Sequence, residues 1–125
     1  MPTKEAHLWQ ARHNEDFCLS FDIEKTPYRD WVVAAIFYTA LHLINAYFSA
    51  TKGSPPKTHN ERDNWVQKAP ELSKIWLDYQ DLKKFRRDAS YEMRQFSAQE
   101  VEKDILPLLN TIKEDLRKLQ PSISY

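Results

Sequence analysis

The chain has 125 residues, 42% of them hydrophobic and 13% aromatic, which is typical of one globular domain over residues 1–125 and excludes a disordered chain. The chain has 18 basic residues (lysine and arginine) and 18 acidic residues (aspartate and glutamate). The net charge is therefore zero, and no global field attracts the protein to nucleic acid or membrane. Any anion binding therefore has to come from a local patch. The single glycine predicts an all-α protein, because the tight hairpins of sheets depend on glycine.

The first predicted element is a helix over residues 4–20, where apolar residues recur broadly at helical spacing. It contains the single cysteine, Cys18, which excludes an internal disulfide and suits a reducing cytoplasm. We expect this thiol to be buried on a helix face rather than reactive. Pro27 then favours a turn or the start of the next helix.

Residues 31–48, WVVAAIFYTALHLINAYF, are apolar nearly all round, which is typical of a helix at the centre of a bundle or in a bilayer. Thr39, His42 and Asn45 form a polar stripe at a spacing of three, and the rest of the chain is polar. We therefore predict a buried central helix and no membrane span. The stripe has three interpretations: a core histidine bonded to a neighbour, the lining of a site, or polar contacts at a helix or subunit interface.

A loop is predicted over residues 51–57, with Gly53 as a left-handed helix cap. THNE, residues 58–61, fits a capping box and predicts a short helix that ends near Lys68. Pro70 then restarts a helix. Its apolar residues keep to steps of three and four, the cleanest amphipathic pattern of the chain: Leu72, Ile75, Trp76, Tyr79, Leu82 and Phe85.

A second capping box, SAQE at residues 97–100, predicts the last helix, which runs to about Leu119. Pro107 lies in its middle and is expected to remove a hydrogen bond and kink it. Four to five helices without an internal repeat predict an antiparallel bundle. No glycine-rich phosphate loop, HExxH motif or cysteine pair occurs, so we predict no cofactor and no metal site.

The segment FRRDASYEMRQF, residues 85–96, is the chain's candidate functional stretch. Its basic residues outnumber the nearby acids, Asp88 and Glu92, and an arginine cluster beside a tyrosine can hold a phosphate and stack a base. The alternative is that these charges cover the solvent side of the helix end and that Tyr91 packs into the core. The candidate ligand-binding residues are Lys83, Lys84, Arg86, Arg87, Tyr91 and Arg94.

The order of AAIFYTALHLINAYF, PKTHNER and YQDLKKFRRDASYEMRQFSAQEVEKDI resembles the HEPN superfamily of small helical proteins, over about residues 5–118. The resemblance implies a HEPN-like bundle that forms a two-fold homodimer. It also implies function: many members are metal-independent ribonucleases, and others bind nucleotides or proteins. Several members are partners of nucleotidyltransferases in toxin–antitoxin or defence pairs.

The ribonuclease motif of that family is an arginine followed, after four to six residues, by a histidine. Here Arg86 is followed at the matching position by Tyr91, whose ordinary pKa near 10 makes it a poor base at neutral pH. We therefore expect a cytoplasmic, non-catalytic module that binds a nucleotide, RNA or a partner protein. The alternative is a ribonuclease with a rearranged site, for which the candidates are Arg86, Arg87, Tyr91 and His42, with His59 as a further histidine.

Overall fold

A computed structural model describes residues 3–123, and all regular structure in that range is helical. The prediction of an all-α bundle is therefore confirmed. A 3₁₀ turn over Pro70–Leu72 precedes α4, a π-helical turn over Val101–Ile105 joins α5 to α6, and a 3₁₀ turn follows α6 at Pro121–Ile123. The α-helices are α1 (Lys4–Leu19), α2 (Arg29–Lys52), α3 (His59–Lys68), α4 (Ser73–Tyr91), α5 (Ala98–Glu100) and α6 (Leu106–Leu119).

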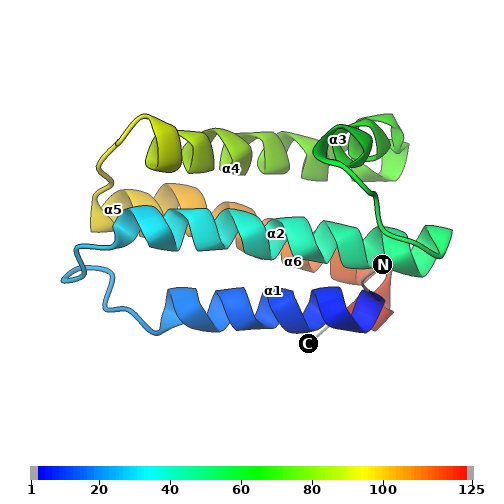
Figure 1. Cartoon of the computed structure of the whole chain (residues 1–125), viewed down its shortest axis with the longest axis horizontal. Helices are drawn as coiled ribbons and strands as arrows, with labels where there is room; N and C mark the ends of the chain where they lie inside the picture. The colour runs from blue at the N-terminus through cyan, green and yellow to red at the C-terminus, as the bar shows by residue number, and fades with distance from the viewer. Residues whose placement is uncertain (1–2, 124–125) are drawn as a thin grey trace.

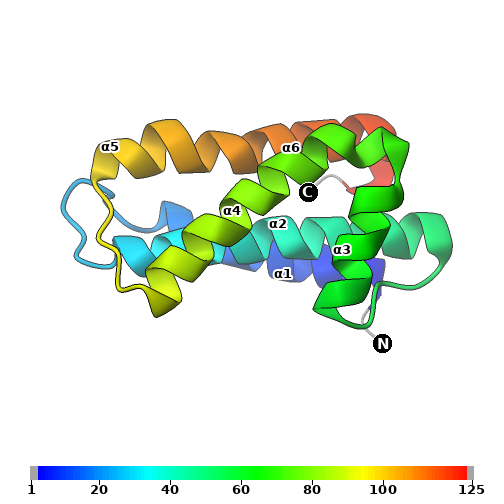
Figure 2. The same ribbon diagram turned by 90° about the horizontal axis from the view of Figure 1, so that it is seen from above.

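The four long helices α1, α2, α4 and α6 alternate in direction along the longest axis of the molecule, as the colour gradient in Figure 1 shows. The central helix is α2, which packs against α1, α4 and α6. Seen from above, α4 crosses the bundle diagonally, and the short α3 lies across one end (Figure 2). The antiparallel arrangement predicted from the sequence is thus present.

The helix α2 forms the core because it is apolar on almost every face. By length and composition it is the one described helix that passes as a candidate membrane span, but 72% of its most apolar window is buried inside the bundle. Helices on every side contribute fully buried side chains that pack on it, including Ala11, Val66, Leu82 and Leu109. The prediction of a buried central helix is confirmed.

The predicted caps are present, with one change in each capping box, but α2 continues through Thr51 and Lys52, which were predicted to lie in the loop. Gly53 ends α2 in the left-handed conformation, at φ 84°. The hydroxyl oxygens of Thr58 and Ser97 each accept a hydrogen bond from the amide three residues later, at 3.0 Å. The reciprocal bonds differ, because Glu61 accepts from the amide of Lys57 and Glu100 instead binds the side chain of Arg94.

Pro107 is accommodated by a widened turn rather than only by a lost hydrogen bond. The amide of Leu106 donates to the carbonyl of Val101, five residues back, and this places a π turn directly before the proline. A pyrrolidine ring collides with the carbonyl four residues earlier in a regular helix, and the wider turn relieves that collision. The local irregularity predicted at Pro107 therefore takes the form of a π turn at Val101–Ile105.

Candidate anion-binding site

Two of the six predicted ligand residues are engaged in ion pairs. Lys83 Nζ lies 2.6 Å from Oδ2 of Asp63, so α4 is tied to α3 at this point. Arg94 pairs with Asp88 at 3.1 Å and also with Glu100, and its guanidinium packs over the ring of Phe96. Through these contacts Arg94 stabilises the loop after α4, and the two carboxylates neutralise most of the charge that a ligand could use.

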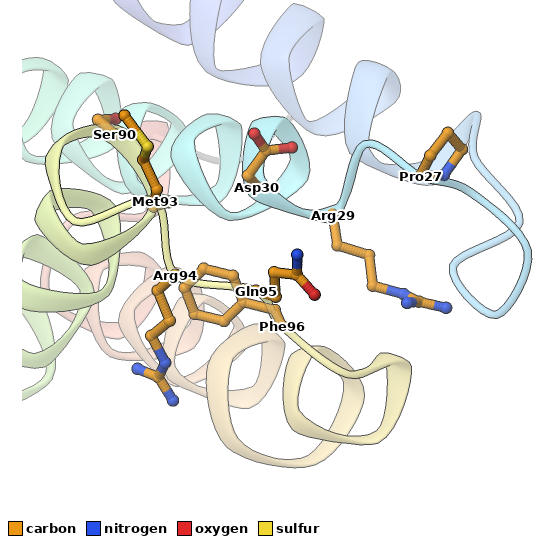
Figure 3. Close-up of a pocket in the computed structure, with 9 residues that line it drawn as sticks. Pro27, Arg29, Asp30, Ser90, Met93, Arg94, Gln95 and Phe96 are labelled. Atoms are coloured by element: carbon orange, nitrogen blue, oxygen red, sulfur yellow. The ribbon is translucent and has the colours of Figure 1, made fainter.

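Arg94 also lines a surface hollow of about 560 Å³ between the start of α2 and the end of α4. The other cation there, Arg29, donates to the carbonyl oxygens of Ile23 and Glu24, at 2.7 Å each. Figure 3 shows the two guanidinium groups pointing in different directions, away from Met93 and from each other. Because both cations are used by the fold, this hollow is not the preferred anion site.

Arg86 differs from Lys83 and Arg94 because its partners are aromatic side chains and not carboxylates. Its NH2 donates to the hydroxyl of Tyr38 at 2.6 Å, and its guanidinium carbon lies 5.4 Å from the centre of the Tyr38 ring and 5.3 Å from that of Tyr91. In the described part of the chain no carboxylate lies within 4 Å of it. Its Nε is buried without an acceptor. Arg86 is therefore a half-buried cation between aromatic rings, and its buried Nε–H has no acceptor.

Tyr91 is 68% exposed, so the interpretation that places it in the core is wrong. The chain leaves the helix after Tyr91, and Phe96 from the following loop fills the core instead, 6.4 Å from the ring of Phe85. Tyr91 is the last residue of α4 and lies one turn after Arg87. Lys84 and Arg87 are exposed on α4, and neither has an ion pair in residues 3–123.

The polar stripe of α2 makes three separate contacts. Thr39 bonds its own helix, through the carbonyl of Ala35 at 2.8 Å. His42 faces α1, where its Nδ1 lies 2.9 Å from Nδ1 of His7. Asn45 faces α3 and accepts from Nε of Arg62 at 2.8 Å. Two of the three residues thus link α2 to other helices. His42 is bonded to a neighbour, as one interpretation has it, but it is half-buried rather than in the core.

Burial lowers the pKa of His42 to about 4, with further contributions from His7 and Arg62. Burial and the charge of Arg62 also lower the pKa of His7. Both rings are therefore neutral at pH 7, and one Nδ1–H donates to the other ring. A pair of this kind links α1 to α2. It is poorly suited to the proton transfers that the rearranged ribonuclease asks of His42, because a catalytic pKa lies near the working pH.

Arg62, which no pattern in the sequence singles out, is only 6% exposed. Its NH1 lies 2.9 Å from Nδ1 of His59, and no carboxylate of residues 3–123 lies within 4 Å of its guanidinium. His59 is the exposed first residue of α3. Burial has the largest effect on the pKa of His59 and lowers it, and the charges of Arg62 and Lys83 lower it further. Asp63 raises this pKa, and Arg86 lowers it by a smaller amount. The local potential at His59 is therefore positive.

A cysteine nucleophile and a metal centre are the two other kinds of site to consider. Burial raises the pKa of Cys18 to about 12, and its Sγ donates to the carbonyl of Val32 at 3.7 Å, so the predicted burial of this thiol is confirmed. Among the described residues, no group of three or more histidine, cysteine, aspartate or glutamate side chains is arranged to hold a metal ion. The unpaired cations around Arg86 and His59 remain as the candidate site.

Comparisons with protein families, with curated proteins and with solved structures found no match to this chain. The function is therefore inferred from the site itself: two arginines without carboxylate partners, an exposed histidine in a positive field, and a tyrosine that offers an open ring face.

Proposed function

We propose that this chain is a non-catalytic, HEPN-like module that binds a phosphate-bearing ligand, either a nucleotide or a short single-stranded RNA, through Arg86. The observation that carries the proposal is the state of this guanidinium. It is half-buried beside Tyr38 and Tyr91, lacks a carboxylate within 4 Å in the described chain, and keeps a buried Nε without an acceptor. An unsatisfied buried donor is costly, and a phosphate oxygen would satisfy it.

The surroundings of Arg86 match the other parts of such a ligand. The exposed ring of Tyr91 provides a face on which an unpaired base can stack. Lys84 and Arg87 on the same helix add positive charge that attracts phosphates at long range. Tyr38 also lines a depression of about 380 Å³, together with Trp31 and residues of α1.

The experiment is a binding titration of the full chain with 5′-AMP and with a short single-stranded RNA, on wild type, Arg86→Ala and Arg117→Ala. Arg117 is an exposed arginine of α6, so it is a matched control for loss of charge. We expect Arg86→Ala to weaken binding at least about tenfold, since a hydrogen bond to a charged group contributes about 1.5–3 kcal/mol. Equal weakening by both variants would show only nonspecific attraction and would refute the proposal.

A second candidate function is metal-independent RNA cleavage by a rearranged site. The observation that favours it is the environment of His59. This histidine is exposed, and its pKa is lowered in part by the charge of Arg86. A neutral imidazole beside a guanidinium supplies a proton-transfer group and a cation for the phosphorane. Cleavage of single-stranded RNA in the presence of EDTA by wild type, but not by His59→Ala or Arg86→Ala, would establish this function in place of the first.

We further propose that the chain acts as a cytoplasmic homodimer and works with a nucleotidyltransferase in a toxin–antitoxin or defence pair. Support for the dimer comes from large aromatic side chains that remain exposed on adjacent α1 and α2, namely Phe17 at 43% and Trp31 at 63%. Sedimentation of wild type and of Trp31→Ser tests this part. A monomer at all concentrations for the wild type would refute it.

A further inference from the structure

We infer that His59 holds the phosphate of the ligand by donating its Nε2–H, and that Arg62, fixed by Asn45, orients the His59 ring for this contact. The inference rests on the proposed function and deepens it. It assigns a second phosphate contact to α3, in addition to Arg86 on α4. It also assigns a positioning role to two residues that lie behind the surface.

The tautomer of His59 follows from the chemistry of its partner. Arginine carries only donors, so the Nδ1 of His59, 2.9 Å from NH1 of Arg62, has to accept this hydrogen bond. A neutral imidazole with an accepting Nδ1 carries its single proton on Nε2. Asn45 in turn accepts from the Nε of Arg62 at 2.8 Å. The series from Asn45 through Arg62 to His59 therefore places the N–H on Nε2, at the edge of the ring that Arg62 does not contact.

The charges around His59 favour an anion at that edge. Arg62 and Lys83 each lower the pKa of His59 more than Asp63 raises it, and Arg86 lowers it further. The carboxylate of Asp63 is itself bound by Lys83 at 2.6 Å. Among the described charged groups that act on His59, the cations therefore have a larger combined effect on its pKa than the carboxylate.

Donors dominate this cluster. Arg62, Lys83 and Arg86 can only donate, and the Nε2–H of His59 donates as well. Phosphate oxygens are acceptors, and they are bound most strongly by charged donors. The Lys83–Asp63 pair ties α3, which carries His59, to α4, which carries Arg86.

This assignment also separates binding from cleavage. A general base needs a free lone pair directed at the proton that it removes. In this tautomer the lone pair of His59 is occupied by Arg62, and the other ring nitrogen carries the proton. His59 is therefore a ligand for phosphate and not the base that the rearranged ribonuclease requires.

The test begins with the nitrogen spectrum of the histidine rings in the ¹⁵N-labelled full chain at pH 7. We expect His59 as the Nε2–H tautomer, and we expect its ring signals to shift on titration with inorganic phosphate and with 5′-AMP but not with chloride. Two variants accompany the spectrum: His59→Ala, which removes the donor, and His59→Gln, whose side-chain amide retains one. We expect His59→Ala to weaken phosphate binding about tenfold, since charge-assisted hydrogen bonds are the strong ones, and His59→Gln to weaken it no more than about threefold.

Arg62→Gln tests separately the charge that Arg62 places beside His59. Its amide can still donate to Nδ1 of His59 but has no charge, so the tautomer is retained while the pKa of His59 rises toward its ordinary value. An unchanged pKa of His59 in a folded Arg62→Gln variant contradicts the effect assigned to that charge. If this buried variant does not fold, the wild-type tautomer still decides the question, because an Nδ1–H tautomer overturns the inference whatever binds.

The remaining outcomes distinguish this inference from the proposed function. If Arg86→Ala abolishes binding while His59→Ala and the His59 signals do not respond, the Arg86 site stands and the role of His59 is refuted. If the tautomer is as expected but wild type binds neither phosphate, 5′-AMP nor RNA, the proposed function fails, and the inference fails with it.

Discussion

Acid is expected to weaken the fold through the contact between α1 and α2. The folded-state pKa of His42 is about 4, against an ordinary value of 6.5, and the pKa of His7 is lowered as well. Between pH 6.5 and 4 the unfolded chain therefore binds protons that the folded chain does not. The part of the stability that depends on a neutral His42 is complete above about pH 6.5. It falls as the pH decreases through this window and is lost in full below about pH 4.

The magnitude follows from the same pKa. The difference between 6.5 and about 4 corresponds to roughly 3 kcal/mol, at about 1.4 kcal/mol for each tenfold change in proton affinity. His42 is only half-buried, so solvent screens part of this energy, and we expect about 1–2 kcal/mol. Against a total stability of about 5–15 kcal/mol, a loss of that size is measurable. Protonating both rings would also set two Nδ1–H groups against each other at the present 2.9 Å.

The assay is urea unfolding of wild type and of His42→Gln at pH 7, 5.5 and 4.5. Other groups titrate in the same range, notably Asp78, whose pKa is raised by burial and which therefore stabilises the fold as the pH falls, and His59, which acts in the direction of His42. These contributions cancel in the difference between the two proteins. We expect His42→Gln to lose less stability than wild type between pH 7 and 4.5. Equal pH dependence of the two proteins would refute the assignment.

Three further predictions concern single residues. Cys18 should not react with a thiol reagent in the folded protein but should react fully in urea, because its pKa is raised to about 12 and it is 8% exposed. Arg94→Ala should lower the unfolding free energy by about 1 kcal/mol, through loss of its pairs with Asp88 and Glu100, and leave 5′-AMP binding unchanged; loss of binding would restore Arg94 to the site. Tyr91→Ala should weaken 5′-AMP binding by about 1–3 kcal/mol without affecting inorganic phosphate, as judged by parallel titrations, if its ring stacks the base.

The architecture was largely predictable because its signals are local. Gly53 sets the end of α2, and Thr58 and Ser97 mark helix starts through bonds to the amides three residues later. The apolar length of the central helix identified the core, although α2 extends to Arg29–Lys52, beyond the predicted residues 31–48. The π turn before Pro107 was not predictable, since the chain can relieve a proline by a kink or by a wider turn.

The site was less predictable, because its main features depend on contacts between helices. Arg62 lies in the strongly polar segment HNERDNW, which by itself indicates a solvated helix, and only the packing of α3 against α2 places it beside Asn45. The six basic and aromatic candidates of α4 and the following loop also look alike in the sequence. Partners from elsewhere divide them: Asp63 and Glu100 neutralise two cations, whereas Tyr38 leaves the charge of Arg86 available.

The burial of Arg62 provides a final way to separate stability from function. A buried guanidinium loses much of its hydration, and here Asn45 and His59 offer hydrogen bonds but no opposite charge. Replacing a buried polar pair by apolar residues of similar size is often neutral or stabilising, provided that both partners are replaced. We therefore expect the double variant Asn45→Leu/Arg62→Met to unfold at the same urea concentration as wild type or a higher one, and yet to bind phosphate more weakly. If it is strongly destabilised instead, Arg62 is a structural residue, and the positive field at His59 is only a consequence of the packing.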